Sequence, residues 1–61
     1  MRISISVYDG IQEEPLRTYP IVSRKDFMRI IRDETSNGFR VCVEYHTRNG
    51  TMTAWHDPIG K

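Results

Sequence analysis

Three side chains with reactive groups lie two residues apart in one stretch of this chain: Cys42, Glu44 and His46. A thiol, a carboxylate and an imidazole can bind zinc or carry out nucleophilic catalysis. On an extended strand, however, Cys42 and His46 would lie about 13 Å apart, since each residue advances the chain by ~3.3 Å. That separation excludes a direct Cys–His dyad, and three ligands spread along one strand cannot converge on one zinc ion. The stretch therefore predicts no catalytic centre, no metal site and no cofactor, although Glu44 and His46 alone leave a weak two-ligand site open.

Three cations recur on one side of a segment with helical periodicity, at Lys25, Arg29 and Arg32. On a helix they would lie opposite the apolar positions, in a row that could follow a phosphate backbone or meet an acidic protein. Asp26 and Asp33 flank the row, and Arg29 with Asp33 forms an i,i+4 pair that is typical of a solvated helix. We interpret the row as a solvated surface and keep it as the alternative binding face.

The elements that position these side chains begin with a predicted β-hairpin over residues 39–57. Apolar and polar residues alternate before the pair Asn49-Gly50 and again after it. An Asn-Gly pair between two such runs favours a type I′ turn, which needs positive φ at both central residues. A two-residue turn at this pair places Glu44 opposite Trp55.

This hairpin sorts its side chains onto two faces of a sheet, because successive residues of a strand point to opposite sides. One face, which a helix would cover, holds Val41, Val43, Tyr45, Met52, Ala54 and His56. The other face is mixed and holds Arg40, Cys42, Glu44, His46, Thr53, Trp55 and Asp57. Nothing else in the sequence is left to cover this second face, which we call the open face. We expect His56 to be a half-buried, hydrogen-bonding residue at the sheet margin and not a functional one.

Two further strands are predicted before the helix. Ile3, Ile5 and Val7 alternate with polar residues, which indicates a strand with one buried face. Residues 16–22 form a weaker strand, in which Pro20 favours an edge or bulge position because proline has no N–H to donate.

The helix has predicted signals at both ends. Ser23 fits the N-cap, with Asp26 as a short-armed capping-box residue, and Val22 and Phe27 are placed for a hydrophobic staple. The helix is expected to run to about Ser36.

Beyond that point, Asn37-Gly38 supplies the left-handed C′ position and Phe39 the hydrophobic contact that follows it. Phe27, Ile30 and Ile31 form the apolar stripe of the helix and are expected to pack on Val41, Val43 and Tyr45. The order is ββαββ, an α+β fold with one helix on a four-stranded, mainly antiparallel sheet. We expect residues 56–61, which include Pro58 and Gly60, to form an irregular tail.

Size and composition narrow the class of protein. The chain has 61 residues, so a single small domain is expected, with little room for the deep cleft that most enzymes need. Nine Lys and Arg against eight Asp and Glu give a net charge of +1, without the basic excess of a general nucleic-acid binder. One cysteine, no secretory signal and no membrane-spanning apolar run favour a reducing, cytoplasmic setting.

These features favour a small non-catalytic binding protein. Phage and mobile-element accessory proteins that inhibit or modulate a host complex are often of this size, an analogy that rests on size alone. We expect a protein partner to dock on the open face around Trp55, with Tyr8, Arg40, Glu44 and His46 beside it, because Trp, Tyr and Arg dominate binding hot spots.

Three alternatives stay open at this point. The first is a small nucleic-acid-binding domain in which Trp55 and His46 stack on bases and arginines contact phosphates. The second is a homodimer, which would relieve the shortage of core. The third concerns the fold: a bulge at the turn would shift the register by one residue and turn Trp55 into the core.

Overall fold

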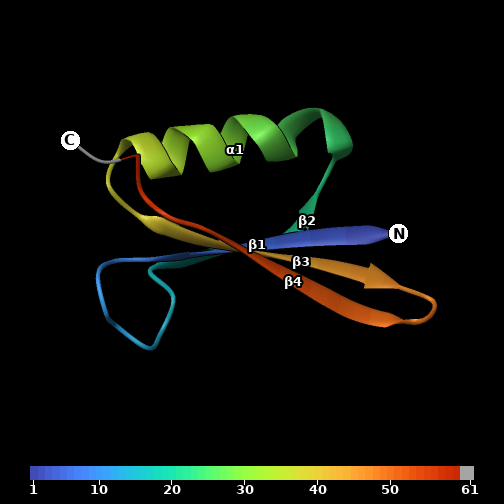
Figure 1. Cartoon of the computed structure of the whole chain (residues 1–61). Coiled ribbons are helices and arrows are strands. Elements are labelled where there is room, and N and C mark those ends of the chain that lie inside the picture. Colours follow the sequence, from blue (N-terminus) through green and yellow to red (C-terminus); the bar gives the residue numbers. More distant parts are fainter. Residues whose placement is uncertain (60–61) are drawn as a thin grey trace.

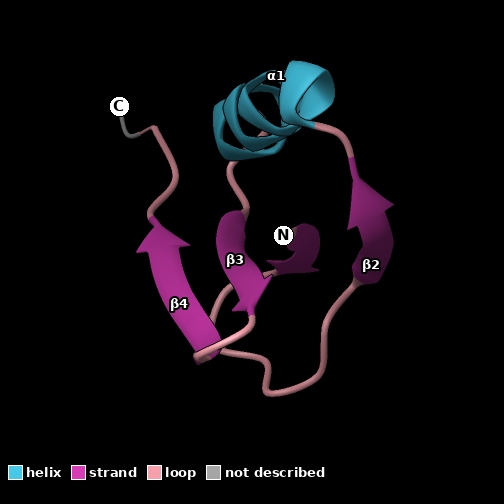
Figure 2. Cartoon of the chain, turned by 90° about the vertical axis from the view of Figure 1, so that its right-hand side faces the viewer, coloured by secondary structure: helices cyan, strands magenta, loops and turns pink. Residues whose placement is uncertain are grey.

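The structure, a computed structural model that describes residues 1–59, contains one helix and four strands. Along the chain these are β1 (Arg2–Tyr8), β2 (Arg17–Val22), α1 (Arg24–Ser36), β3 (Arg40–Thr47) and β4 (Gly50–His56). The strands form one antiparallel sheet in the order β2-β1-β3-β4, and α1 lies across one of its faces (Figures 1 and 2). The predicted α+β fold and the element order ββαββ are confirmed.

The core lies between α1 and the two middle strands, β1 and β3. Alternate residues of β1 are buried, as the sequence pattern predicts, whereas β3 buries Val41, Cys42 and Val43 in succession. Ile31 meets the helix-side residues of both strands from the helix. The buried cluster consists of Ile3, Ile5, Val7, Val22, Ile31, Val41 and Val43. The partly buried residues packed against it are Tyr19, Phe27, Ile30, Phe39 and Tyr45. The predicted packing of the helix stripe on β3 is confirmed.

The start of α1 is correctly predicted, but the role of the Ser23 side chain is not. Ser23 Oγ donates a hydrogen bond to Asp26 Oδ2 at 3.1 Å and makes no bond to a backbone N–H of the first turn. The backbone carbonyl of Ser23 instead accepts the N–H groups of Asp26 and Phe27, both at 3.0 Å. Since the hydroxyl proton is directed to the carboxylate, Ser23 does not act as a side-chain cap.

The end of α1 is a Schellman motif, as predicted from Asn37, Gly38 and Phe39. Gly38 has a φ of +92°, in the left-handed region that favours glycine. Its N–H donates to the Thr35 carbonyl at 3.1 Å, and the N–H of Phe39 donates to the Glu34 carbonyl at 3.1 Å. These bonds satisfy carbonyls of the last turn and turn the chain back toward the sheet.

The edge position predicted for the strand that contains Pro20 is also confirmed. β2 is an outer strand that pairs only with β1, and the pairing shifts register between Ile3 and Ile5. An outer strand tolerates proline because one side of it needs no backbone donor.

The predicted turn of the β3–β4 hairpin is wrong by one residue. The turn residues are Arg48 and Asn49, and Thr47 pairs with Gly50 across the turn. Within residues 1–59 no residue other than glycine has a positive φ, which excludes a type I′ turn. The Thr47 side chain stabilises the observed turn, since its Oγ1 accepts the N–H of Asn49 at 3.2 Å and donates to the Gly50 carbonyl at 2.8 Å.

The register of the hairpin is therefore shifted by two residues from the prediction. Cys42, and not Glu44, lies opposite Trp55, while Glu44 lies opposite Thr53. A shift of two residues preserves the faces, because side chains alternate with a period of two. The predicted division of β3 and β4 into a helix-side face and an open face is confirmed.

The tail is shorter and better anchored than predicted. His56 is the last residue of β4, and it lies half-buried on the helix side as expected. No hydrogen bond of its side chain occurs within residues 1–59. Residues 57–59 are irregular, but the N–H of Ile59 donates to the Thr35 carbonyl at 3.0 Å and ties the tail to α1. The last two residues of the predicted tail, 60–61, lie outside the described residues.

Candidate functional site

The open face of the sheet is the surface on which the sequence places the binding residues. It lies on the side away from α1, and the loop of residues 9–16 descends on that same side (Figure 1). Register places the following side chains on it: Arg2, Ser4, Ser6, Tyr8, Thr18, Arg40, Cys42, Glu44, His46, Thr51, Thr53 and Trp55. No helix or strand of residues 1–59 covers this side (Figure 2). The face is available to a partner.

Tyr8, Arg40 and Trp55 form a compact group at one end of the open face, which we call the Arg40 cluster. The Arg40 guanidinium lies 4.7 Å from the centroid of the Trp55 ring and 5.7 Å from that of Tyr8. The two rings are 5.2 Å apart and tilted by 49°. Arg40 Nε also donates to the Gly10 carbonyl at 3.2 Å, which links the cluster to the adjacent loop. Cation–π and edge-type ring contacts thus hold all three side chains in one arrangement.

Trp55 belongs to the open face and not to the core. Its side chain is half-exposed, at 50%. The alternative in which a one-residue bulge turns Trp55 inward is wrong, because β3 and β4 pair without interruption from Val41–His56 to Thr47–Gly50.

A second group on the open face is polar and consists of Ser4, Glu44, His46 and Thr51. Ser4 Oγ donates to Glu44 Oε1 at 3.3 Å and lies 3.0 Å from His46 Nε2. The other ring nitrogen of His46 lies 3.3 Å from Thr51 Oγ1. Sequence reasoning missed Ser4 here, although its position on the polar side of β1 was the signal for it.

A serine, a histidine and a carboxylate in contact call for comparison with a hydrolytic triad. In a triad the histidine accepts the serine proton on one ring nitrogen and donates to the carboxylate from the other. Here Glu44 Oε1 lies 3.7 Å from the same nitrogen of His46 that faces Ser4, and the other ring nitrogen faces Thr51 Oγ1. The arrangement is a surface hydrogen-bond network and does not activate the serine.

Cys42 separates the two groups. It lies between Arg40 and Glu44 on β3, opposite Ser6 on one side and Trp55 on the other. Although it is on the open face, it is buried, with 7% exposed. Burial, and secondarily the charge of Glu44, raise the pKa of the Cys42 thiol. The five predicted binding residues therefore fall into two groups: Tyr8, Arg40 and Trp55 lie together, and Glu44 and His46 lie further along the face.

The positive charge at the centre of the alternative binding face on α1 is neutralised by neighbouring carboxylates. Arg29 lies between two carboxylates, 3.3 Å from Asp26 and 3.8 Å from Asp33. Lys25 and Arg32 are exposed on either side of it. The pairs are surface pairs of the kind expected on a solvated helix.

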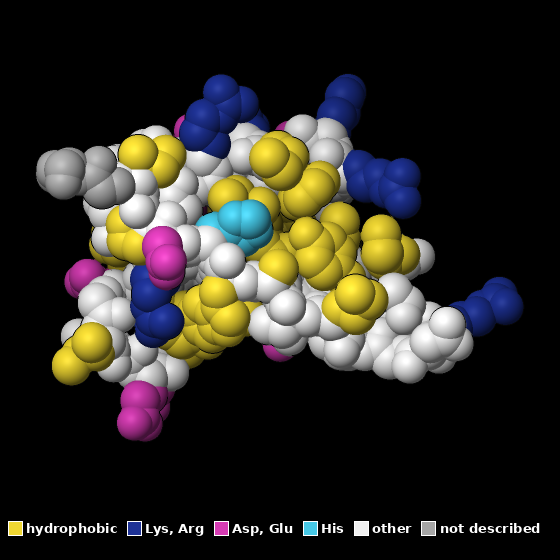
Figure 3. Space-filling model, in the orientation of Figure 1, with side chains coloured by type: hydrophobic (Ala, Val, Ile, Leu, Met, Phe, Trp, Pro, Cys, Tyr) yellow, Lys and Arg dark blue, Asp and Glu magenta, His cyan; other side chains and the backbone are white. Residues whose placement is uncertain are grey.

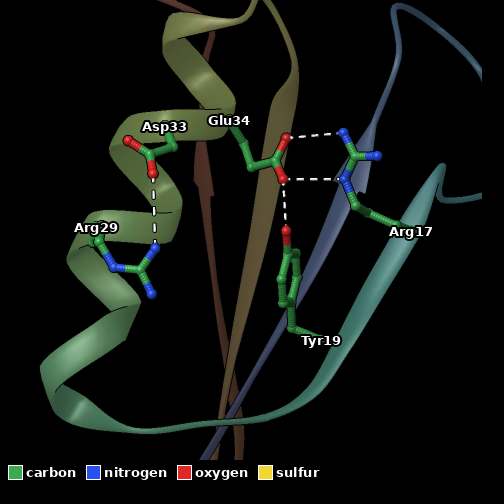
Figure 4. Close-up of polar contacts among 5 residues, drawn as sticks. All are labelled: Arg17, Tyr19, Arg29, Asp33 and Glu34. Atoms are coloured by element: carbon green, nitrogen blue, oxygen red, sulfur yellow. Dashed lines mark hydrogen bonds and ion pairs between the residues drawn. The ribbon is translucent and has the colours of Figure 1, made fainter.

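The most buried charged side chain within residues 1–59, Glu34, lies on the other side of the sheet and was not predicted from the sequence. Arg17 donates two hydrogen bonds to its carboxylate, and Tyr19 donates a third at 2.7 Å (Figure 4). The Arg17 bonds lower the pKa of Glu34, against the opposing effect of burial, and the bond to Glu34 raises the pKa of Tyr19. With all these donors on one carboxylate, this cluster ties β2 to α1 and satisfies the Glu34 side chain.

Within residues 1–59 there is no detectable pocket and no group of three or more His, Cys, Asp or Glu side chains that could hold a metal ion. Over the same range no helix has the length and apolar character to cross a membrane. No protein-family model, curated protein or solved structure matches the chain.

Proposed function

We propose that this protein is a small non-catalytic binding protein whose open face docks a protein partner around Trp55. The observation that carries the proposal is the Arg40 cluster, in which a half-exposed Trp55 is held against Arg40 and Tyr8. By analogy of size we place it with phage or mobile-element accessory proteins that inhibit or modulate a host complex, in the cytoplasm.

Pre-organisation is the physical argument for binding at this cluster. Fixing a flexible side chain at an interface costs about 0.5–1.5 kcal/mol, and a cluster that is already ordered avoids part of that cost. Arg40 is held by two rings and by the Gly10 carbonyl through Nε. A partner that offers an apolar side chain to Trp55 and a carboxylate to Arg40 suits the cluster best. Glu44 and His46 would lie at the polar rim of this interface.

A nucleic acid is the second candidate, because an exposed Trp beside an Arg is also a stacking platform for bases. The charge argues against it: the net charge is +1, and Arg29 on α1 is already paired with Asp26 and Asp33. A protein that makes several phosphate contacts loses affinity steeply as salt rises. The salt dependence of binding separates the two candidates.

The decisive experiment compares two substitutions on opposite faces of the same strand. Trp55→Ala alters the open face, whereas Met52→Ala alters the helix side of β4, where Met52 is 66% exposed. Both variants should keep the far-ultraviolet circular dichroism of the wild type, since both side chains are at the surface. We expect wild type and Met52→Ala to capture the same protein from a lysate of the native host, and Trp55→Ala to lose it.

Each other outcome contradicts the proposal. Retention of the captured protein by a folded Trp55→Ala variant would move the site away from the open face. Capture of nucleic acid that is released by moderate salt would favour the second candidate. If neither wild type nor Met52→Ala binds anything, the function is not one of stable binding.

A further inference from the structure

The two outer strands of the sheet differ in how their free edges are protected. β2 carries Pro20 and a register shift, both of which hinder the addition of another strand. β4 runs from Gly50 to His56 without a proline, a lysine, an arginine or an acidic residue, and it pairs regularly over its whole length. Every second residue of such a strand directs its backbone N–H and C=O outward, where no strand of residues 1–59 meets them. β4 is therefore an unprotected edge.

We propose that β4 pairs with β4 of a second copy of this chain, in antiparallel orientation, and joins two sheets into one. A two-fold axis at Thr53, the middle of the strand, places Thr53 of the two copies opposite each other. It then places Met52 opposite Ala54 of the second copy, and Thr51 opposite Trp55 of the second copy. Each pair lies on one face, because the register keeps helix-side residues with helix-side residues. Thr–Thr and aromatic–Thr neighbours are favourable cross-strand pairs.

The charges that flank β4 favour a second copy over an unrelated strand. Arg48 lies in the turn before the strand and Asp57 directly after it, and both are exposed. Neither forms an ion pair in the part of the chain that the structure describes. In this register Asp57 of each copy lies opposite Asn49 of the other and one position from Arg48 of the other, twice by symmetry. Between these ends the strand has no charge, so two copies meet without repulsion.

The helix side of β4 provides the apolar area for this contact. α1 covers the middle strands and leaves the helix side of β4 open (Figure 2). Met52 on β4 and Met28 on α1 are 66% and 57% exposed. Hydrophobic side chains gather in the region between α1 and the β3–β4 hairpin (Figure 3). A second sheet added at this edge would cover part of that apolar area. This burial would stabilise a domain whose own core is small.

The first test is sedimentation equilibrium of the full chain over a range of concentrations. We expect a mass twice that of one chain at high concentration. Thr53→Lys places two lysines against each other at the axis and should give a monomer. Thr18→Lys is the matched control, since Thr18 is also an exposed threonine on the open face, but of the other edge strand. Wild type that stays monomeric at millimolar concentration, or a Thr53→Lys variant that still dimerises, overturns the proposal.

The second test is a charge exchange between the two ends of the strand. Arg48→Asp and Asp57→Arg should each weaken the dimer, by about threefold in dissociation constant for surface pairs of this kind. The double variant should restore the wild-type dissociation constant, because each new Asp meets a new Arg. Failure of the double variant to restore it would overturn the antiparallel pairing. Both tests use the purified chain alone, so their outcome is independent of the partner proposed for the Arg40 cluster.

Discussion

Arg17, the first residue of β2, holds the carboxylate of Glu34 in the last turns of α1 through two parallel hydrogen bonds. They run from Nε to Oε2 at 3.0 Å and from Nη2 to Oε1 at 3.1 Å. The Glu34 side chain is 9% exposed, whereas that of Arg17 is 44% exposed. The pair therefore connects an edge strand to the helix at the boundary between core and solvent. Because the Arg17 guanidinium stays protonated, the ionisation of Glu34 decides how the contact depends on pH.

Glu34→Gln should destabilise the protein at neutral pH by about 1.5–3 kcal/mol, the range for hydrogen bonds to a charged group. The pKa of Glu34 is lower in the folded state, so Glu34 stabilises the fold above its ordinary pKa of about 4.3. This stabilisation is lost as the pH falls through the lowered pKa. Urea unfolding at a series of pH values should show wild type and variant converging in acid. Asp33→Asn, an exposed carboxylate on the same helix, is the control that should change stability little; a pH-independent gap for Glu34→Gln would contradict the prediction.

Ile31→Ala should reduce the free energy of unfolding by about 2–5 kcal/mol, because it removes a buried aliphatic side chain from the centre of the core. In a domain of this size that would leave much of the population unfolded. Thermal unfolding measures the effect. Met28→Ala on the same helix, at a position that is 57% exposed, should change the melting temperature little. Equal effects of the two substitutions would show that the helix packs on the sheet through a different face.

Ser23→Ala should cost less than about 0.5 kcal/mol, as for an ordinary surface substitution. A serine that caps the first turn through its hydroxyl would cost about 1 kcal/mol. Ser23 is not such a residue, since its hydroxyl donates to Asp26. The first-turn N–H groups are accepted by its backbone carbonyl, which the substitution leaves in place. Denaturant unfolding distinguishes the two values. A loss near the larger value would show that the hydroxyl caps the helix in solution.

Gly38→Ala should destabilise the protein by about 1–2 kcal/mol, the cost of placing an L-residue in the left-handed region. The space beside Gly38 is open, so the cost comes from the backbone and not from a clash. Ser36→Ala, two residues earlier and still within α1, is the control and should be neutral. Circular dichroism during thermal unfolding records both. An unchanged stability of Gly38→Ala would mean that the Schellman motif is not kept in solution.

The fluorescence of Trp55, the single tryptophan of the chain, should report the open face directly. A half-exposed indole should emit at long wavelength and be quenched readily by iodide, and the nearby Arg40 should attract that anion. Arg40→Gln should therefore reduce the quenching by iodide while quenching by neutral acrylamide stays the same. Blue-shifted emission that iodide does not quench would place Trp55 in a protected environment and contradict the open face.

Local patterns in the sequence predict most of this fold correctly. The left-handed Gly38 and the alternating burial of β1 depend on neighbouring residues, and both are confirmed. The turn is wrong because an Asn-Gly pair can stand at the centre of a turn or across its end, and the Thr47 side chain stabilises the second arrangement. The face of Trp55 is still correctly predicted, since the register error is an even number of residues.

The contacts that sequence patterns miss join residues far apart in the chain. Glu34 and Arg17 are separated by 17 positions, and Ser4 and Glu44 by 40. Both depend on the strand order, which places β1 between β2 and β3. Hydrophobic periodicity is the same for every strand order. It therefore cannot predict these pairs or the contact of Tyr8 with Arg40 and Trp55.

The central position of β1 has a consequence for the time course of folding. The sheet consists of two local hairpins, β1–β2 and β3–β4, that become one structure only when β1 meets β3. That pairing closes a loop of about forty residues, whose entropy must be lost before the contacts stabilise it. We expect each hairpin and the helix to form transiently on their own, with the encounter of β1 and β3 as the slow and cooperative step that commits the chain to its native state.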